Sequence, residues 1–151
     1  MTITDVDEFD VGSVSDTDSD ANTLAEDVSN GASAEITASA TDADGTTNTV
    51  TYAITAQSCS GAFAIDASTG AVTVADTSAI DYDAGTTCTV TVRATSADSS
   101  TADATFTVTL TDVNDQTPTY TSADTTPDVA ENTKAVETVA ITDTDLSLIH
   151  I

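Results

Sequence analysis

The sequence has almost no basic residues, because only Arg93 and Lys134 oppose 26 aspartates and glutamates and give a formal net charge of −24 on 151 residues. Such a surface repels nucleic acid and anionic lipid, so neither is expected as a partner. The surface also repels itself unless cations are bound. Aromatic residues make up 4% of the chain and tryptophan is absent. On composition alone, a disordered acidic segment is the alternative to a folded protein that attracts cations.

Long apolar runs are also missing. No stretch approaches the ~20 residues of a transmembrane helix, so the chain is not expected to span a membrane itself. The residues after Met1 lack the basic start and apolar core of a signal peptide, which predicts an internal fragment of a longer protein. The single histidine, His150, and the absence of a Gly-x-Ser-x-Gly elbow, a phosphate loop or a zinc spacing argue against an enzyme.

Apolar and polar residues alternate with a period of two along much of the chain. This pattern is typical of β-strands and is not expected of a disordered segment. The predicted inward-facing sets are Ile36, Ala38 and Ala40; Val50, Tyr52 and Ile54; Phe63 and Ile65; Val72 and Val74; Cys88, Val90, Val92 and Ala94; and Phe106, Val108 and Leu110. With a short opening strand near Leu24, these sets predict an all-β fold, a seven-stranded sandwich. A module of about 100 residues buries roughly two thirds of its unfolded surface.

Two cysteines are too few for a thiolate zinc site but compatible with one disulfide. Strand parity points Cys88 inward, and Cys59 lies in the loop that leads to Phe63, so a bridge between them is sterically reasonable. Two small buried thiols are the alternative. A bridge would favour an oxidising, extracellular environment.

Three acidic motifs recur in the same order at offsets of 107, 105 and 101 residues. Asp5-Val6-Asp7-Glu8 recurs as Asp112-Val113-Asn114-Asp115, Ala25-Glu26-Asp27 as Ala130-Glu131-Asn132, and Thr41-Asp42-Ala43-Asp44 as Thr142-Asp143-Thr144-Asp145. This order predicts tandem modules: residues 1–13 end one repeat, 14–115 form a complete repeat, and 116–151 begin another. The hexapeptide 146–151 breaks the pattern and resembles a translated sequencing adapter, so we interpret it as non-native.

The segment between the predicted repeats, residues 112–118, reads Asp-Val-Asn-Asp-Gln-Thr-Pro. It places three oxygen-bearing side chains within four residues and is stiffened by Pro118. Such a segment is a poor core strand but a good source of ligands for a hard cation, and calcium is the natural candidate. A metal there would stiffen the hinge between two modules.

Several motifs together resemble a cadherin repeat, in the order and at the spacing of that family. They are Glu26; Thr41-Asp42-Ala43-Asp44-Gly45 with Asn48 and Tyr52; Phe63-Ala64-Ile65-Asp66 with Thr69-Gly70; Ile80-Asp81-Tyr82-Asp83; Val92-Arg93-Ala94; and residues 112–118. The resemblance implies a Greek-key, immunoglobulin-like sandwich in tandem. The Ala- and Thr-rich composition is similar to the cadherin-like repeats of large bacterial surface proteins.

The resemblance also implies calcium between successive repeats. The implied junction ligands are Glu26, Asp81 and Asp83 from the first repeat; Asp112, Asn114 and Asp115 by side chain and Val113 and Gln116 by carbonyl from the linker; and Asp143 and Asp145 from the second. An incomplete copy at the other end would use Asp7, Glu8, Asp42, Asp44 and the Asn48 carbonyl. Calcium takes six to eight oxygens at about 2.3 to 2.6 Å, so the junction set could hold two or three ions.

The chain departs from the family pattern at a few positions. Asp83 replaces a longer Glu, and Ser96 stands where the family has an aspartate, with Asp98 nearby as a possible substitute. The N-terminal linker copy lacks the proline. The alternative for all these acids is solvated turn residues, but two carboxylates about 4 Å apart repel by about 4 kcal/mol at an effective dielectric near 20, which favours a bound cation. Asp16, Asp18 and Asp20 also resemble the start of an EF-hand loop, although Ala21 replaces its glycine.

We therefore expect a calcium-binding module of an extracellular, cell-surface repeat protein that mediates cell adhesion and is attached to a membrane or wall. Neighbouring repeats are the expected partners within the chain, and the surface partner is an unidentified protein or carbohydrate. A passive calcium-stiffened spacer and a filament or matrix subunit are the alternatives. Homophilic adhesion would need a docking residue at the tip of a first module, which this sequence does not contain.

Overall fold

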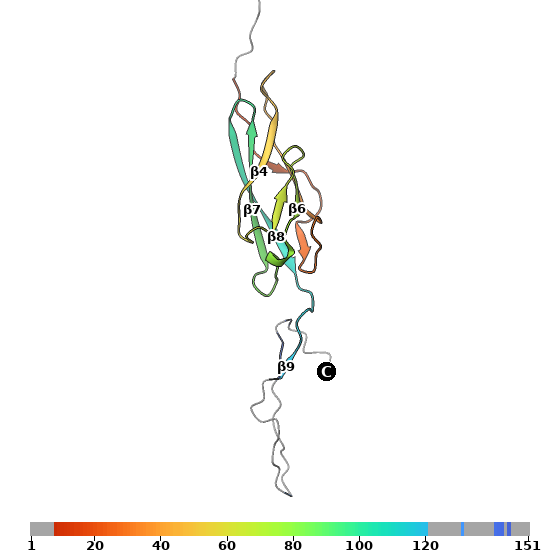
Figure 1. Ribbon diagram of the computed structural model, residues 1–151. Coiled ribbons are helices and arrows are strands. Elements are labelled where there is room, and N and C mark those ends of the chain that lie inside the picture. The colour runs from red at the N-terminus through yellow and green to blue at the C-terminus, as the bar shows by residue number, and fades with distance from the viewer. Residues whose placement is uncertain (1–7, 121–130, 132–140, 144, 146–151) are drawn as a thin grey trace, which may run out of the picture. The chain divides into compact units, whose positions relative to one another are not determined.

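The protein is described by a computed structural model, in which residues 8–120, 131, 141–143 and 145 are placed (Figure 1). The chain divides into two units, Met1–Asp112 and Val113–Ile151. The first unit contains almost all of the described strands. The predicted residues Asp7 and 146–151 lie outside the described part of the chain.

The first unit is a sandwich of two four-stranded sheets, which confirms the predicted fold class. One sheet has the order β1-β3-β6-β5, with β1 at Ser15–Asp16, β3 at Ser33–Ser39, β6 at Ala71–Val74 and β5 at Phe63–Ile65. The other has the order β2-β8-β7-β4, with β2 at Thr23–Ala25, β8 at Thr101–Thr111, β7 at Thr87–Ser96 and β4 at Val50–Gln57. In the described part of the chain, helix is limited to the 3-10 turn Thr77–Ala79.

The pattern of small β-branched residues explains the longest strands. Along β7 the buried residues alternate with threonines, and Cys88, Val90, Val92 and Ala94 are each fully buried. β8 pairs with β7 in an antiparallel register in which Val90 faces Phe106 and Val92 faces Ala104. Because successive side chains of a strand point to opposite faces, one face enters the core and the threonines stay outside.

The remaining core residues come from the facing sheet, from the other strands of the β7 sheet and from the loops. Ile36, Val72 and Val74 are among the largest fully buried side chains. Tyr52 on β4 reaches the loop after β3, where its hydroxyl accepts a hydrogen bond from the Ala40 amide at 2.9 Å. This bond gives the polar end of a buried tyrosine a partner and fixes the start of that loop.

A close approach between β3 and the turn before β6 requires Gly70. The Gly70 carbonyl accepts a hydrogen bond from the Ala38 amide at 2.9 Å, and the Gly70 φ angle is +74°. A Cβ at this position would overlap the carbonyl oxygen of Ala38. Only glycine has both the conformational freedom and the lack of a side chain that this contact needs.

In the structure Cys59 and Cys88 form a disulfide, with Cα atoms 5.5 Å apart and a sequence separation of 29 residues. The bridge fastens the loop after β4 to the first residues of β7. Cys88 is fully buried, as strand parity predicts. The module therefore has a covalent link in addition to a core built mainly from small residues.

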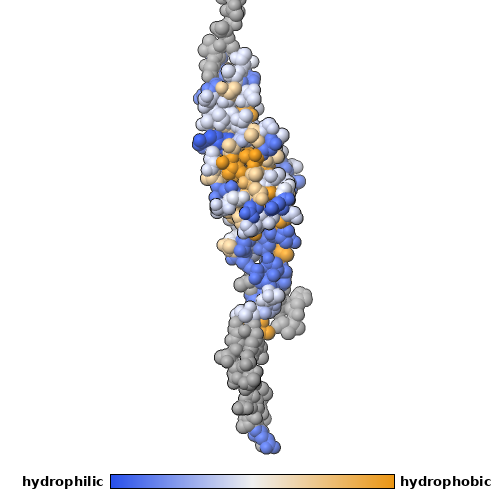
Figure 2. Space-filling view, in the orientation of Figure 1, coloured by the Kyte–Doolittle hydropathy of each residue, from blue (hydrophilic) through white to orange (hydrophobic). Residues whose placement is uncertain are grey.

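All seven predicted strands are present. The structure adds β1, whose two residues pair with Ser39 and Ala38 of β3. The outer face of the β7–β8 pair carries mainly threonine together with one ion pair, in which Arg93 donates to both carboxylate oxygens of Asp103 at 2.8 and 2.7 Å. Figure 2 shows apolar surface gathered at the middle of this unit, with hydrophilic surface around it.

Among the described residues of the second unit, β9 (Thr119–Tyr120) and β10 (Ile141–Thr142) form an antiparallel pair. In the sequence, the motif Asn114–Gln116 precedes β9 and the motif Asp143–Asp145 directly follows β10. In the described residues, no helix is long and apolar enough to cross a bilayer.

Candidate metal centre

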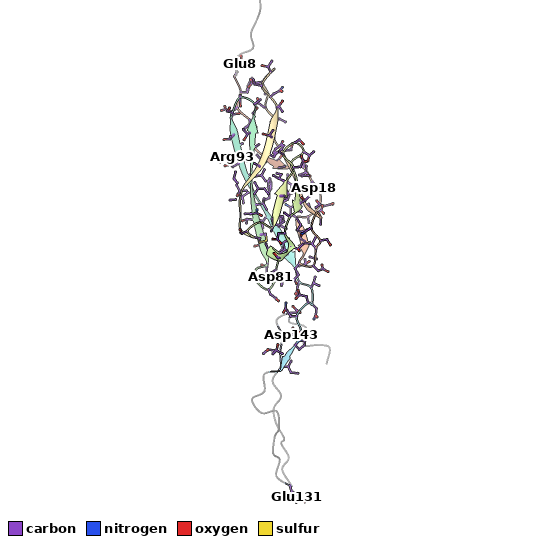
Figure 3. All side chains as sticks on the ribbon, viewed as in Figure 1. Glu8, Asp18, Asp81, Arg93, Glu131 and Asp143 are labelled. Carbon is purple, nitrogen blue, oxygen red and sulfur yellow. A yellow bond between two sulfur atoms is a disulfide. The ribbon has the colours of Figure 1, made fainter. Side chains whose placement is uncertain are left out.

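Acidic side chains gather at the two ends of the first unit. Figure 3 shows Glu8 at one end of this unit and Asp81 at the opposite end. The loop between β3 and β4 supplies Asp42 and Asp44 to the first of these ends. The turn Ile80–Asp83 and the linker residue Asp112 belong to the other.

The β3–β4 loop is organised by its own carboxylates. Asp42 Oδ1 accepts a hydrogen bond from the Asp44 amide at 3.1 Å, and the Asn48 side chain donates to the Asp44 carbonyl at 2.8 Å. Asp44 Oδ1 in turn accepts from the amides of Glu8 and Phe9 at 3.1 and 3.3 Å. The predicted N-terminal residues Glu8, Asp42, Asp44 and Asn48 are thus brought together, with Asn48 acting by its amide group.

Each of the two loop carboxylates keeps one oxygen that is buried without a hydrogen-bond partner among the described residues: Asp42 Oδ2 and Asp44 Oδ2. Asp44 as a whole is 3% exposed. A buried carboxylate oxygen without a donor loses hydration and gains nothing in return. These orphaned oxygens are what a hard cation such as calcium would satisfy, so this donor set fits that ion.

Hydrogen bonds keep Asp42 in its charged form. The Ser96 hydroxyl and the Asp44 amide hold the pKa of the Asp42 carboxyl below its usual value. The Ser96 hydroxyl has one proton, and it donates to the Thr47 carbonyl at 3.0 Å. Among the described residues, the Asp44 amide has no other acceptor and donates to Asp42 Oδ1 directly, so it stabilises the charged carboxylate in this arrangement. An ionised Asp42 is the form that a cation binds.

Asp98, in the turn between β7 and β8, joins this end of the unit. It offers a carboxylate oxygen that lies within 4.8 Å of oxygens from Asp42 and Asp44. The departure at Ser96 was visible in the sequence, which suggested Asp98 as a substitute but gave no reason to include it in the ligand set. Asp44 and Asp98 are 54 residues apart in the sequence, so their proximity can be seen only in the folded structure.

At the opposite end of the first unit, Glu26 is tied to the turn after the 3-10 helix. Its Oε2 accepts a hydrogen bond from the Tyr82 amide at 2.7 Å, so Glu26 lies against the segment that carries Asp81 and Asp83. Asp81 Oδ1 accepts from the Ala84 amide at 3.1 Å. Asp83 and Asp112 each offer an oxygen within 4.8 Å of the other, and both are exposed. The first-repeat part of the predicted junction set is therefore gathered in one place.

The remaining predicted junction ligands belong to the second unit. Gln116 donates its amide to Asp145 Oδ2 at 2.6 Å and its side-chain nitrogen to Asp115 Oδ1 at 2.8 Å. Asp143 Oδ1 accepts from the Asp145 amide at 3.2 Å. Asn114 is exposed and Val113 is partly buried. Within this unit, the linker and the Asp143–Asp145 motif lie together.

Other acids have a local structural role. Asp16 Oδ1 accepts from the amides of Asp18 and Thr37 at 3.0 and 2.9 Å, which folds the loop that resembles the start of an EF-hand. The Ser68 hydroxyl and neighbouring amides lower the pKa of Asp66 to about 2, because they stabilise its charged form in a turn. These contacts account for both acids as turn residues.

Comparison with known proteins identifies the family to which this sandwich belongs. A family model described as the cadherin domain matches residues 22–111. Among solved structures, mouse cadherin-23 EC22-24 is similar with a TM-score of 0.73 and 23% identity, over 93% of this chain and 45% of that one. The extracellular cadherin domains 1-4 of protocadherin gamma B7 give a TM-score of 0.76 at 19% identity, over 93% of this chain and 34% of that one.

Human CDH23 EC21-23 is similar with a TM-score of 0.69 and 25% identity, over 94% of this chain and 46% of that one. The chain spans less than half the length of each of these structures. No relative among curated proteins matches it. The family match extends over well more than half of the sequence and coincides with the sandwich from β2 to β8. The chain therefore belongs to the cadherin domain family.

Proposed function

We propose that this chain is a calcium-binding module of an extracellular repeat protein that serves cell adhesion, with calcium stiffening the junctions between repeats. The observation that carries the calcium part is the pair of buried carboxylate oxygens on Asp42 and Asp44 that have no partner among the described residues. Membership of the cadherin domain family supports the adhesive part. The disulfide between Cys59 and Cys88 agrees with an oxidising, extracellular location.

The charge of the chain supports the same proposal. Of the 26 aspartates and glutamates, those of the proposed ligand sets lie close together in loops, whereas the outer face of the β7–β8 pair carries mainly threonine. Clustered carboxylates repel one another unless a cation lies between them. Calcium would supply the missing positive charge and coordinate the oxygens, and the loops hold those oxygens in place.

Calcium is expected to raise the melting temperature of the chain. Modules of this type bind calcium with dissociation constants of about 10⁻⁴ to 10⁻³ M. At tenfold excess over that constant, one site stabilises the folded state by about 1.4 kcal/mol, which corresponds to roughly 5 to 10 °C. Circular dichroism melting in millimolar calcium and in chelator measures the shift. Identical curves in the two conditions would contradict calcium binding.

A conservative variant makes this measurement specific. Asp44→Asn keeps the volume of the side chain and an oxygen that can accept from the Glu8 and Phe9 amides, but removes the negative charge. It should lose much of the calcium-dependent shift. Asp27→Asn removes one charge from an exposed residue outside the ligand sets and should keep the shift. An equal response of the two variants would indicate non-specific charge screening.

The junction proposal has its own test, in a chain that carries the whole following repeat. Asp115→Ala should remove a shared ligand, loosen the angle between repeats and leave each sandwich folded. Small-angle X-ray scattering in calcium should then show a broader distribution of conformations than for the unaltered chain. Asp27→Ala is the matched control. Asp103 is unsuitable as a control because it pairs with Arg93. Equal scattering of both variants would mean that the junction ligands are misassigned.

A further inference from the structure

Residues 45–65 form the longest uncharged segment of the chain. These 21 residues contain no aspartate, glutamate, lysine or arginine, although the whole sequence has 26 acidic and two basic residues among 151. The next longest uncharged segments, residues 67–75 and 84–92, have nine residues each. A gap of this size in so acidic a chain indicates that one region of the folded unit is free of charge.

The uncharged segment forms the edges of both sheets on one side of the sandwich. It contains β4 and β5, which are the last strands in the orders β2-β8-β7-β4 and β1-β3-β6-β5. The two edges lie side by side, because the Gln57 side chain accepts from the Phe63 amide at 2.9 Å and donates to the Phe63 carbonyl at 3.3 Å. We call the strands Val50–Gln57 and Phe63–Ile65 together the β4–β5 side.

The β4–β5 side is apolar as well as uncharged. Ile54 and Ile65 pack against the core but remain partly exposed, and Ala53, Ala56 and Ala64 are exposed. The apolar surface in Figure 2 lies at the middle of the unit, where Figure 1 labels β4. The outer face of β7 and β8 is also nearly neutral, but threonine hydroxyls cover much of it. A neutral apolar surface gains free energy when another surface covers it.

The opposite side of the sandwich carries the other two edges, β1 and β2, and is acidic. Asp16 lies in β1, Asp18 and Asp20 follow it, and Glu26 and Asp27 come directly after β2. Two copies of a chain with a net charge of −24 therefore repel each other strongly at this side. The β4–β5 side adds no such local repulsion, so it is the side at which two copies can come into contact.

We propose that the β4–β5 side packs against the same side of a second copy of this chain. A contact between identical surfaces is isologous and closes as a pair, so it needs no further partner. A glycan fits this side less well, because its aromatic rings, Tyr52 and Phe63, are buried and offer no face on which a sugar ring could stack. The pairing goes beyond the proposed function, because it joins modules side by side and does not depend on calcium between repeats.

Side chains, and not a shared ladder of backbone hydrogen bonds, would carry this contact. The Tyr52 amide on the edge of β4 already donates to the Ala67 carbonyl at 2.9 Å, and a bulge between Ile54 and Ala56 interrupts the regular pairing of the strand. Covering loops and bulges are devices by which natural sheets prevent continuous pairing at an edge. The pair is therefore expected to be reversible and concentration-dependent, and not to grow into fibres.

Sedimentation velocity of the 151-residue chain, measured in chelator from micromolar to millimolar concentration, tests the pairing. The weight-average mass should rise from that of the 15.2 kDa monomer toward twice that value. Added sodium chloride should strengthen the association, because it screens the repulsion between two acidic chains and leaves the apolar contact in place. The amide NMR signals of Ile54, Ala56 and Ala64 should shift with concentration, and those of Asp18 and Asp20 should not.

Three substitutions of exposed alanines by aspartate locate the contact. Ala56→Asp on β4 and Ala64→Asp on β5 each place a carboxylate on the β4–β5 side of both copies, and each should weaken the association by about tenfold or more. Ala21→Asp adds the same charge just before β2, on the acidic side, and should leave the dissociation constant essentially unchanged. Melting temperatures equal to that of the unaltered chain verify that the variants fold.

Three results would overturn the proposal. A chain that stays monomeric at millimolar concentration has no such contact. Association that persists unchanged in both Ala56→Asp and Ala64→Asp uses another part of the molecule. Shifts of the Ile54 and Ala64 signals on addition of dextran, in a chain that stays monomeric, would assign this side to a neutral glycan instead. None of these results bears on calcium binding, which the melting experiment in calcium and in chelator tests separately.

Discussion

Reduction of the Cys59–Cys88 disulfide is expected to lower the free energy of unfolding of the first unit by about 3.5 kcal/mol. The bridge spans 29 residues in the sequence, and closing a loop of that size removes a corresponding amount of chain entropy from the unfolded state. This loss is a large fraction of the stability of the unit, because many of its buried residues are small, such as Ala34 and Ala94, and contribute little hydrophobic stabilisation. Thermal melting with and without reductant should differ by roughly 15 to 25 °C.

The double variant Cys59→Ala/Cys88→Ala is the control, because its melting temperature should not respond to reductant. Mass spectrometry of the unreduced protein should show the two cysteine peptides linked. Full alkylation of both thiols without reductant would refute the bridge. The ligand loops lie outside the bridged residues 59–88, except for Asp81 and Asp83, so calcium binding at the Asp44 end should survive reduction.

Gly70→Ala is expected to be among the most destabilising single substitutions in the first unit, at about 3 to 5 kcal/mol. Two costs add: a residue with a side chain is strained at a φ of +74°, and the new Cβ would overlap the Ala38 carbonyl oxygen. Because that carbonyl belongs to the backbone of β3, relief requires the turn to move away from the sheet. Equilibrium unfolding in urea measures the loss.

Gly31→Ala separates the two costs. Gly31 has a φ of +87°, but a Cβ there would meet nothing within 4 Å. It should therefore lose only the conformational part, about 1 to 2 kcal/mol. If Gly70→Ala cost no more than Gly31→Ala, the close approach between the turn and β3 would not be a constraint on the fold.

The strands were predictable because a sandwich repeats one simple rule along each of them. On β7 the alternation of threonine with Cys88, Val90 and Val92 leaves a single way to bury the apolar side chains. β1 gave no such signal, since it consists of Ser15 and Asp16 and is defined only by its pairing with β3. Two polar residues at a sheet edge form a strand because their partner strand is there, and not through their own preference.

The candidate metal centre was predictable where its ligands belong to one motif, such as Asp42 and Asp44. Asp98 could be suggested as a substitute but not assigned, because its distance to the other two depends on how the β7–β8 turn approaches the β3–β4 loop. The hydrogen bond from the Asn48 side chain to the Asp44 carbonyl could not be derived from the sequence, whereas the role of the Asn48 carbonyl as a ligand stays a prediction. The direction of a side chain in a loop depends on the local hydrogen bonds of the loop backbone, and the alternation of apolar and polar residues does not predict these bonds.

The parallel pairing of β2 with β8 determines how the first unit would respond to a pulling force. Leu24 faces Leu110 across this pair, near the two ends of the sandwich in the sequence. Because the strands run in the same direction, tension on the two ends of the chain would slide one strand along the other, so their hydrogen bonds would be loaded together and not broken one by one. Once they gave way, the disulfide would keep its 29-residue span from extending, and the tether would be about 100 Å shorter than without the bridge.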